Sequence, residues 1–413
     1  MKEKVQAPEL RFEGFTDDWE ERKVSEITDF HKQGFYTKES YNENKKYYLL
    51  RGTDMTSNKL ILKDTPKINA SEKDYEDFKV LKDDFLIVRS GTVGTYAIVK
   101  SDITAIFGSY LINFRFNQSI VLNEFFGLFY QSSLFKSQLN KIIQKSSNVN
   151  INAENIKSTN IKFPTIEEQQ KIGAFFQSID DTIALHQRKL DLLKEQKKGY
   201  LQKMFPKNGA KVPELRFAGF ADDWEQRKLS DVANHRGGTA IEKYFDKDGV
   251  YKVISIGSYG LNSQYVDQNI RAISNEITDG RVVNSGELTM VLNDKTANGT
   301  IIGRTLLVEK DNEYVINQRT EIISPKENFD SSFAYTILNG PFREKVKRIV
   351  QGGTQIYVNY PAVSNLNLEL PEIEEQQKIG SFFKQLDDTI ALHQRKLELL
   401  KEQKKGFLQK MFV

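Results

Sequence analysis

A stripe of mostly apolar residues occurs twice in the chain, at alternating spacings of four and three residues. A 3.5-residue period over more than four heptads is typical of the seam of a coiled coil. At about 1.5 Å per residue, each predicted helix is some 55–60 Å long. The seam positions are Ile172, Phe176, Ile179, Ile183, His186, Leu190, Leu193, Lys197, Tyr200 and Met204, then Ile379, Phe383, Leu386, Ile390, His393, Leu397, Leu400, Lys404, Phe407 and Met411.

The predicted helices have recognisable ends. Thr165-Ile166-Glu167-Glu168 fits a capping box after Pro164, and Phe205-Pro206-Lys207-Asn208-Gly209 supplies a stop. Each helix could pack separately on its own globular domain, but two near-identical seams in one chain favour mutual pairing. In an antiparallel pair, His186 and His393 would lie near each other as polar interruptions that fix the register.

The helices belong to a larger internal repeat. Residues 8–27 and 213–232, here called the A segments, match at 14 of 20 positions. Residues 166–205 and 373–412, the B segments, match at 34 of 40 positions. The intervening stretches, about 28–160 and 233–367, show little obvious similarity. The chain therefore carries a duplicated scaffold and two unlike inserts.

The two inserts have the mixed pattern of α+β domains. Residues 84–89, 288–292 and 300–308 are apolar or β-branched runs that predict strands, and residues 123–141 and 332–350 have helical patterns. Turn residues occupy 90–94 and 296–299. The predicted fold is thus two mixed α/β domains separated by two long helices in an antiparallel coiled coil, with pseudo-two-fold symmetry.

Composition narrows the function classes. The 413 residues include 59 basic and 56 acidic side chains, a net charge of +3, which excludes a histone-like polycation but not a local basic groove. The absence of cysteine excludes disulfides, thiolate zinc sites and a cysteine nucleophile. The first ten residues lack an apolar core and no apolar run approaches 18 residues, so we expect a cytoplasmic protein that does not enter a membrane.

Several catalytic motifs are missing. No two prolines are adjacent, so the chain lacks the Asn/Asp-Pro-Pro-aromatic turn that holds the target amine in methyltransferases acting on the amino group of adenine. No glycine precedes a lysine and no proline precedes an aspartate, which excludes a P-loop and the usual opening of a PD-type nuclease motif. G-x-S-x-G and H-E-x-x-H are absent too. We expect neither catalytic residues nor a metal site.

Two further histidines, His31 and His235, follow the A segments at nearly equivalent places. Each precedes a cation and a glycine-containing turn. The sequence leaves two interpretations open: loops near an anionic backbone, or solvated turns.

A duplicated scaffold with unlike inserts has a geometric consequence. The repeated parts can bind two copies of one partner, whereas the inserts cannot read the same target. On DNA, such a protein would recognise two different half-sites at a fixed separation.

The repeated Pro-x-Ile-Glu-Glu-Gln-Gln-Lys-Ile at 164–172 and 371–379 resembles the specificity subunits of type I restriction–modification systems. The repeated Pro-Glu-Leu-Arg-Phe-x-Gly-Phe-x-x-Asp-Trp resembles them too, and the resemblance covers essentially the whole chain. It implies a non-catalytic DNA-binding subunit with target recognition domains at 1–160 and 207–367 and long helices at 161–206 and 368–413.

The same resemblance implies the partners: double-stranded DNA, two methyltransferase subunits that modify adenine at N6, and two ATP-dependent restriction–translocase subunits. S-adenosylmethionine, ATP and Mg²⁺ would then be bound by those subunits and no cofactor by this chain.

Base readout needs polar side chains on loops. The candidates in the first insert are Arg51, Thr53, Asp54, Arg89, Ser90, Thr92, Lys145, Ser146, Ser147 and Asn148. Those in the second insert are Ser255, Ser258, Tyr259, Asn293, Lys295, Asn298, Gly353, Thr354, Gln355 and Tyr357. The segments 144–150 and 351–357 align without a gap yet differ at most positions, as expected for a reader that changes its side chains and keeps its frame.

Two other functions remain possible from the sequence: a scaffold that grips two protein clients, or an enzyme with duplicated active sites. A steep salt dependence of DNA affinity would argue against the scaffold. Matching polar constellations in the two inserts would be expected of the enzyme, and the sequence has none beyond His31 and His235.

Overall fold

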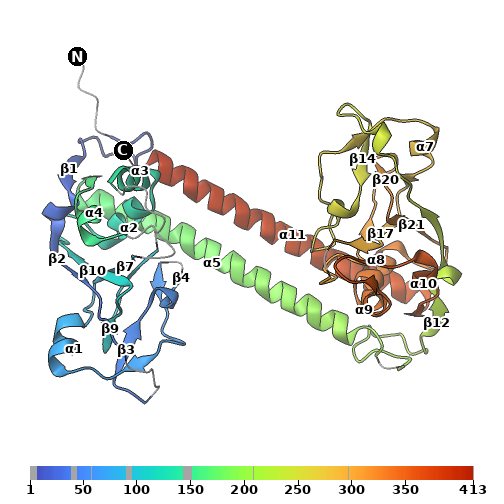
Figure 1. Ribbon diagram of the computed structural model, residues 1–413, viewed down its shortest axis with the longest axis horizontal. Helices are drawn as coiled ribbons and strands as arrows, with labels where there is room; N and C mark the ends of the chain where they lie inside the picture. The colour runs from blue at the N-terminus through green and yellow to red at the C-terminus, as the bar shows by residue number, and fades with distance from the viewer. Residues whose placement is uncertain are drawn as a thin grey trace. The chain divides into compact units, whose positions relative to one another are not determined.

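The computed structural model describes residues 7–38, 44–56, 58–89, 95–142, 151–207, 209–295 and 297–412. The chain divides into two compact units, one formed by residues 1–186 and 396–413 and the other by residues 187–395. Each unit therefore holds one insert and part of each long helix (Figure 1).

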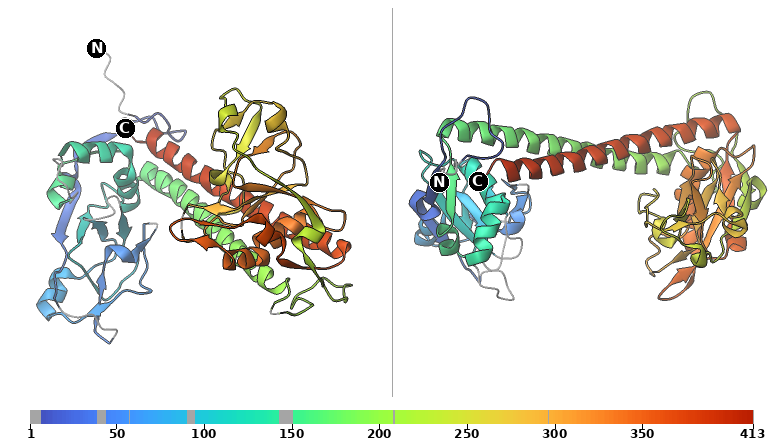
Figure 2. Two further views of the ribbon diagram at one scale, coloured as in Figure 1. Left: turned by 45° about the vertical axis from the view of Figure 1, so that its right-hand side comes forward. Right: turned by 90° about the horizontal axis from the view of Figure 1, so that it is seen from above.

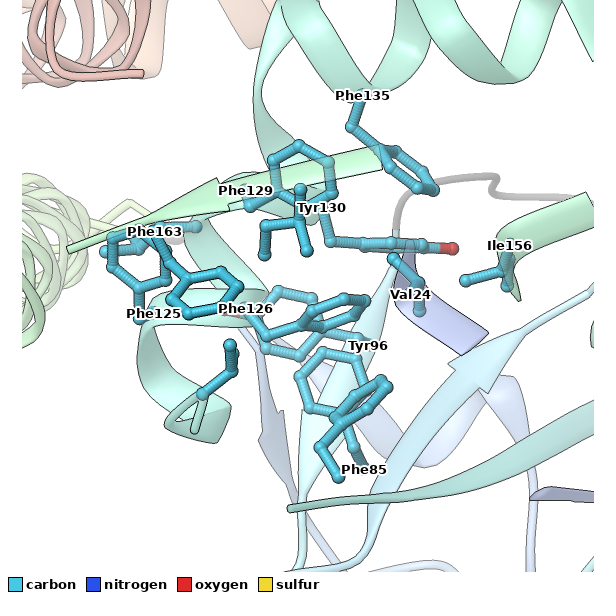
Figure 3. Packing of buried hydrophobic residues seen from close by; sticks show 14 of the residues in the cluster. Val24, Phe85, Tyr96, Phe125, Phe126, Phe129, Tyr130, Phe135, Ile156 and Phe163 are labelled. Carbon is cyan, nitrogen blue, oxygen red and sulfur yellow. The ribbon is translucent and has the colours of Figure 1, made fainter. Parts of the chain in front are cut away.

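The core of the first unit lies on an antiparallel sheet with the order β2-β10-β7-β8. Helices on one face close this core, and aromatic rings fill most of it (Figure 3). Phe85 at its centre stacks on Tyr96 with a 4.7 Å centroid separation and meets Phe126 edge-on at 5.3 Å. The elements are β2 (Thr28–Gln33), β7 (Phe85–Val88), β8 (Tyr96–Ile98), β10 (Leu111–Phe116), α2 (Asn123–Gln131), α3 (Ser133–Ile142) and α4 (Ala153–Lys157).

A second, smaller sheet in this unit has the order β6-β3-β9, with β3 and β9 parallel. Strand β1, at the end of the A segment, pairs with β11, the strand that precedes the first long helix. The remaining elements are β1 (Glu20–Lys23), η1 (Val24–Ile27), β3 (Tyr47–Leu50), η2 (Gly52–Asp54), β4 (Met55–Thr56), β5 (Lys59–Leu60), β6 (Lys67–Ile68), α1 (Glu72–Phe78), β9 (Ala105–Phe107) and β11 (Asn160–Phe163).

The second unit repeats the strand order of the main sheet despite the unlike sequence. Its main sheet has the order β13-β21-β17-β19, and its smaller sheet has the order β15-β14-β20-β16. The main sheet comprises β13 (Ala233–Gly237), β17 (Leu288–Val291), β19 (Thr305–Leu307) and β21 (Thr320–Pro325), with α8 (Ser331–Asn339), α9 (Pro341–Arg348) and α10 (Tyr360–Ser364).

The other elements of the second unit include a third small sheet, β18-β23-β22. They are β12 (Glu225–Lys228), α6 (Leu229–Val232), η3 (Glu242–Tyr244), β14 (Tyr251–Ile254), η4 (Ile256–Ser258), β15 (Arg271–Ala272), α7 (Glu276–Asp279), β16 (Val282–Val283), β18 (Asn293–Asp294), β20 (Tyr314–Ile316), β22 (Gln351–Gly352), β23 (Ile356–Tyr357) and β24 (Asn367–Leu370).

The two B segments form continuous helices, α5 (Ile166–Lys203) and α11 (Ile373–Lys410), as both views of Figure 2 show. In the first unit Phe175 meets Phe407 and Asp180 pairs with Lys404 at 2.6 Å. In the second, Tyr200 meets Phe382 and Lys197 pairs with Asp387 at 2.5 Å. The start of each helix thus contacts the end of the other, which confirms the antiparallel coiled coil.

All predicted seam positions are buried or half-buried. Leu185 and Leu392, between seam positions, are instead 63% and 64% exposed. The seam is therefore the face that the helices bury. His186 and His393 are half-buried and both have interaction partners within the protein.

The A segments tie the two helices of each unit together. Arg11 donates two hydrogen bonds of 2.8 Å to the buried carboxylate of Glu168 near the start of α5. The adjacent Leu10 N–H donates to the carbonyl of Lys410 at the end of α11. In the second unit Arg216 and Glu375 repeat the bidentate pair at the same distances. The repeated spacing of the A segment therefore serves helix docking.

The first of these pairs corrects the predicted capping box. Thr165 does cap α5, since its Oγ1 accepts the N–H of Glu168 at 3.5 Å. The Glu168 carboxylate, however, is bound by Arg11 and does not return to the Thr165 backbone as the motif requires. A tertiary ion pair has replaced the local hydrogen bond of the capping box.

Three boundaries differ from prediction. The strand expected over 300–308 is limited to β19, because residues 300–303 form a turn with Gly303 at φ +70°. The helix expected over 123–141 breaks at Ser132, whose hydroxyl bonds the carbonyl of Phe129. The one expected over 332–350 breaks before Pro341, which begins α9. The turn expected at 90–94 lies outside the described residues.

Candidate nucleic-acid interface

Two loop candidates of the second unit come together in the small sheet β18-β23-β22. Asn293 in β18 pairs with Tyr357 in β23, and Tyr357 pairs in turn with Gln351. This hairpin carries Gly353, Thr354 and Gln355, all exposed, while Tyr357 is 40% exposed. The sheet thus brings segments about 60 residues apart in the sequence to one polar surface.

Buried side chains bind the backbone of the loop that follows β18. Arg343 is 7% exposed and donates hydrogen bonds of 2.8–2.9 Å to the carbonyls of Gly299, Thr300 and Ile302. Burial lowers the pKa of Arg343 to about 10, so the guanidinium still carries its charge at neutral pH. Asp294 accepts the N–H of Ile301 at 2.8 Å. This fixed base supports the exposed tip with Lys295 and Asn298.

Ser258 and Tyr259, predicted as loop residues, are instead interior. Ser258 is fully buried, and its Oγ accepts the N–H of Ser255 at 3.2 Å. Tyr259 is 4% exposed and donates to Thr289 Oγ1 at 2.9 Å, and burial raises the pKa of its hydroxyl. Both side chains stabilise the turn after β14. Only Ser255 of this group is partly accessible.

The equivalent turn in the first unit also has a structural role. Asp54 is 5% exposed and accepts the N–H of Arg51 at 2.7 Å. The Arg51 guanidinium binds the same carboxylate at 2.9 Å and the carbonyl of Asp64 at 3.0 Å. Thr53 between them is exposed. Ser90, Thr92, Lys145, Ser146, Ser147 and Asn148 lie outside the described residues.

Arg89 in the first unit makes the same backbone hydrogen bonds as Leu292 in the second unit. Its N–H donates to the carbonyl of Tyr110 at 3.0 Å, and its own carbonyl accepts the N–H of Ile151 at 3.0 Å. Leu292 makes the same two bonds, to Arg319 at 3.0 Å and from Val358 at 2.9 Å. Both units therefore build one backbone frame here and attach different side chains to it.

His31 and His235 lie in strands, not in the loops or turns that the sequence predicted. His31 in β2 is opposite Phe114 and contacts Glu154 at 3.4 Å. His235 in β13 bonds Glu321 at 2.6 Å, and its ring lies 4.4 Å from that of Tyr360. Pairing with β10 and β21 fixes both histidines on the edge strand of the main sheet.

Sequence reasoning missed two residues beside this frame, Arg319 and Glu321. With Asn293, Tyr357, Asn359 and Tyr360 they line a hollow of the second unit. Arg319 is exposed and adopts φ +66°, a left-handed conformation that arginine rarely takes. Glu321 is 6% exposed, and burial raises the pKa of its carboxyl group. The turn residues Asn317-Gln318 were the available signal in the sequence.

No catalytic constellation accompanies this surface in the part of the chain that the structure describes. Among those residues, no group of three or more histidine, aspartate or glutamate side chains could hold a metal ion. No helix within the described ranges is both long and apolar enough to cross a membrane.

Residues 16–195 and 221–402 match the type I restriction modification DNA specificity domain. The chain belongs to this family. It is the DNA specificity subunit of a type I system and is itself non-catalytic, which confirms the resemblance seen in the sequence.

Two specificity subunits of Methanocaldococcus jannaschii are similar to this one. That of the type I restriction enzyme MjaVIII is 24% identical over 292 residues, which cover 68% of each chain. The putative MjaX subunit is 22% identical over 433 aligned positions, covering 95% of this specificity subunit and 92% of the relative.

Solved structures share the fold. The S subunit of the type I restriction–modification system from M. genitalium has a TM-score of 0.62 at 14% identity, covering 98% of this chain and 99% of that one. A chain from a structure on complex assembly and conformational transition of the type I R-M system has a TM-score of 0.55 at 17% identity, covering 94% and 96%.

Proposed function

We propose that this specificity subunit recognises a bipartite, asymmetric DNA site, with one half read by each insert. The recognition domains are residues 1–160 and 207–367, and the coiled-coil helices are residues 161–206 and 368–413. The shared frame at Arg89 and Leu292 carries this proposal. Equal backbones bearing different side chains suit two readers of the same DNA geometry and different bases.

The duplicated helices hold two methyltransferase subunits in this proposal. Equivalent leucines stand out on the non-seam face of both helices: Leu192 is 51% and Leu399 56% exposed, in addition to Leu185 and Leu392. Repeated exposed apolar side chains are suited to two copies of one protein partner. Two restriction–translocase subunits complete the complex, which assembles on DNA in the cytoplasm. S-adenosylmethionine, ATP and Mg²⁺ are bound by those partner subunits.

The experiment is a single-molecule map of N6-methyladenine in a methylation-free host that expresses this subunit with its methyltransferase. We expect one bipartite, asymmetric motif that is absent without this subunit. Exchanging residues 28–160 for those of a relative should then change one half only. Changes in both halves would contradict separate readers, and methylation independent of this subunit would contradict the function itself.

The coiled coil is proposed to set the distance between the half-sites. Three heptads inserted after Gln187 and again after Gln394, which are equivalent positions, lengthen each helix by about 32 Å. This is close to one turn of B-DNA, so both domains keep their rotational phase. We expect the same half-sites with a gap about nine base pairs longer. A single heptad changes the phase and should abolish methylation, whereas an unchanged gap would refute the ruler.

A further inference from the structure

The hollow beside the shared frame combines a donor and an acceptor that the sequence analysis did not identify. Arg319 and Glu321 are separated by one residue at the start of β21, and both line it. The exposed residues Tyr357 and Asn359 line it as well. The hollow therefore adjoins the polar surface of the β18-β23-β22 sheet.

The turn that carries Arg319 is fixed by its neighbours. Asn317 is 7% exposed, and its side chain binds the N–H of Gln318 at 2.8 Å and the carboxylate of Glu242 at 3.0 Å. The Arg319 carbonyl accepts the Leu292 N–H. Its guanidinium has no hydrogen bond or ion pair with any other residue in the described ranges. A rigid turn thus presents a free five-donor fork.

Glu321 supplies the complementary acceptor. Its Oε1 bonds His235 at 2.6 Å, whereas its Oε2 receives no hydrogen bond from the described residues. The Glu321 side chain is 8% exposed and lines the hollow, so this oxygen has little water to replace a protein donor. An amino group of a ligand in the hollow would satisfy it.

We infer that Arg319 and Glu321 read a G·C base pair in the major groove of the half-site bound by the second recognition domain. Arginine matches O6 and N7 of guanine with two hydrogen bonds, and glutamate accepts from N4 of cytosine. The inference rests on the proposed function and adds to it the bases and the residues that contact them.

The first domain carries a different pair at these positions. Tyr110 makes the backbone bond that Arg319 makes, and is 69% exposed. Ile112, opposite Gln33, takes the place of Glu321, opposite Gly237. An aromatic and an aliphatic side chain cannot make the two polar contacts, so the first domain does not read G·C in this way.

The test replaces the guanidinium group of Arg319 and keeps its positive charge. Arg319→Lys in the complex with the methyltransferase should lower the preference for guanine at one position of the second half-site by about tenfold or more, measured as methylation rates on G·C against A·T substrates. Glu321→Gln should lower the preference at the same base pair. Lys310→Ala, which removes an exposed cation beside Glu309, the partner of Lys384 on α11, should leave the motif unchanged.

The outcomes separate the inference from the proposed function. A wild-type complex without a bipartite motif overturns both. An intact wild-type motif overturns the inference alone if its second half contains no G·C pair, if both variants keep full preference, or if they slow methylation equally on every sequence. Arg319→Gly, which the left-handed backbone accommodates freely, checks that any lost preference is not due to misfolding.

Discussion

The two inserts show little sequence similarity and agree in the strand order of their main sheets. Their main sheets have the orders β2-β10-β7-β8 and β13-β21-β17-β19, and a parallel pair links each smaller sheet, β3 with β9 and β14 with β20. The backbone frame at Arg89 and Leu292 is the same. Backbone hydrogen bonds do not depend on side-chain identity, so the frame can be kept while the presented residues change.

The repeated segments show the reverse relation, because there the side chains themselves hold the structure. Arg11 with Glu168 and Arg216 with Glu375 make the same bidentate pairs. Phe15 with Lys171 and Phe220 with Lys378 make equivalent cation–π contacts at 4.6 Å. The two copies of the scaffold thus repeat their side-chain contacts, whereas the two inserts repeat their backbone pairing.

The largest predicted effect tests whether the scaffold holds both units alike. Arg216→Leu leaves the Glu375 carboxylate, which is fully buried, without its partner. Removing one partner of a buried ion pair lowers the free energy of unfolding by about 3–5 kcal/mol. Arg11→Leu should have the same effect, because it leaves Glu168 without its partner. Urea denaturation followed by tryptophan fluorescence measures both, because Trp19 and Trp224 lie in the two cores.

A matched control is Arg227→Leu, whose partner Glu225 is 68% exposed. An exposed pair contributes about 1 kcal/mol or less. If Arg11→Leu and Arg216→Leu differed by more than the control costs, the two units would not be held alike.

The scaffold was the predictable part of the fold. A heptad pattern is local, so Ile172, Phe176 and their repeats indicate the helix and its buried face without tertiary knowledge. The ion pair of Arg11 with Glu168 joins residues 157 apart in the sequence and was not foreseen. It also redirected a glutamate that local rules had assigned to a capping box.

The two inserts were predictable only in fold class. Their common strand order depends on pairings such as Ile254 with Ile316, which no local pattern encodes. For the same reason, Ser258 and Tyr259 were expected in accessible loops although tertiary packing buries them. Arg319 and Glu321 were missed because their positions depend on the pairing of β21 with β13 and β17.

A second prediction sharpens the difference between the domains. Gly127 in α2 faces Tyr96, and an added Cβ would lie 2.3 Å from the Tyr96 hydroxyl oxygen. The second domain has Tyr335 at this place in α8, because Phe125 and Phe333 make equivalent contacts with Trp19 and Trp224, and Thr305 in β19 takes the place of Tyr96. Gly127→Ala should therefore cost about 1–3 kcal/mol from overpacking, partly offset by about 1 kcal/mol of helix propensity.

Ala334→Gly in α8, at the buried residue before Tyr335, provides the comparison. It should cost about 1 kcal/mol, because glycine disfavours the helix and a buried methyl group is lost. Thermal denaturation of each variant measures both. A stabilising Gly127→Ala would mean that Tyr96 moves away at little cost and that the first core does not need a glycine at this site.

The smallest predicted effect concerns the register of the coiled coil. Lys197 and Lys404 interrupt the apolar seams, and each reaches an aspartate of the other helix. These pairs are a quarter to a third exposed at most, so each contributes about 0.5–1 kcal/mol. A polar residue in a seam fixes the alignment of the helices more than it stabilises them, because other registers leave it unpaired.

The test reverses the charge of one partner. Lys404→Glu places a second carboxylate next to Asp180 and should lower the melting temperature by a few degrees, and adding Asp180→Lys should restore it. Lys197→Glu with Asp387→Lys should behave in the same way. If Lys404→Glu were harmless alone, the register would be set by the apolar seam residues without help from these ion pairs.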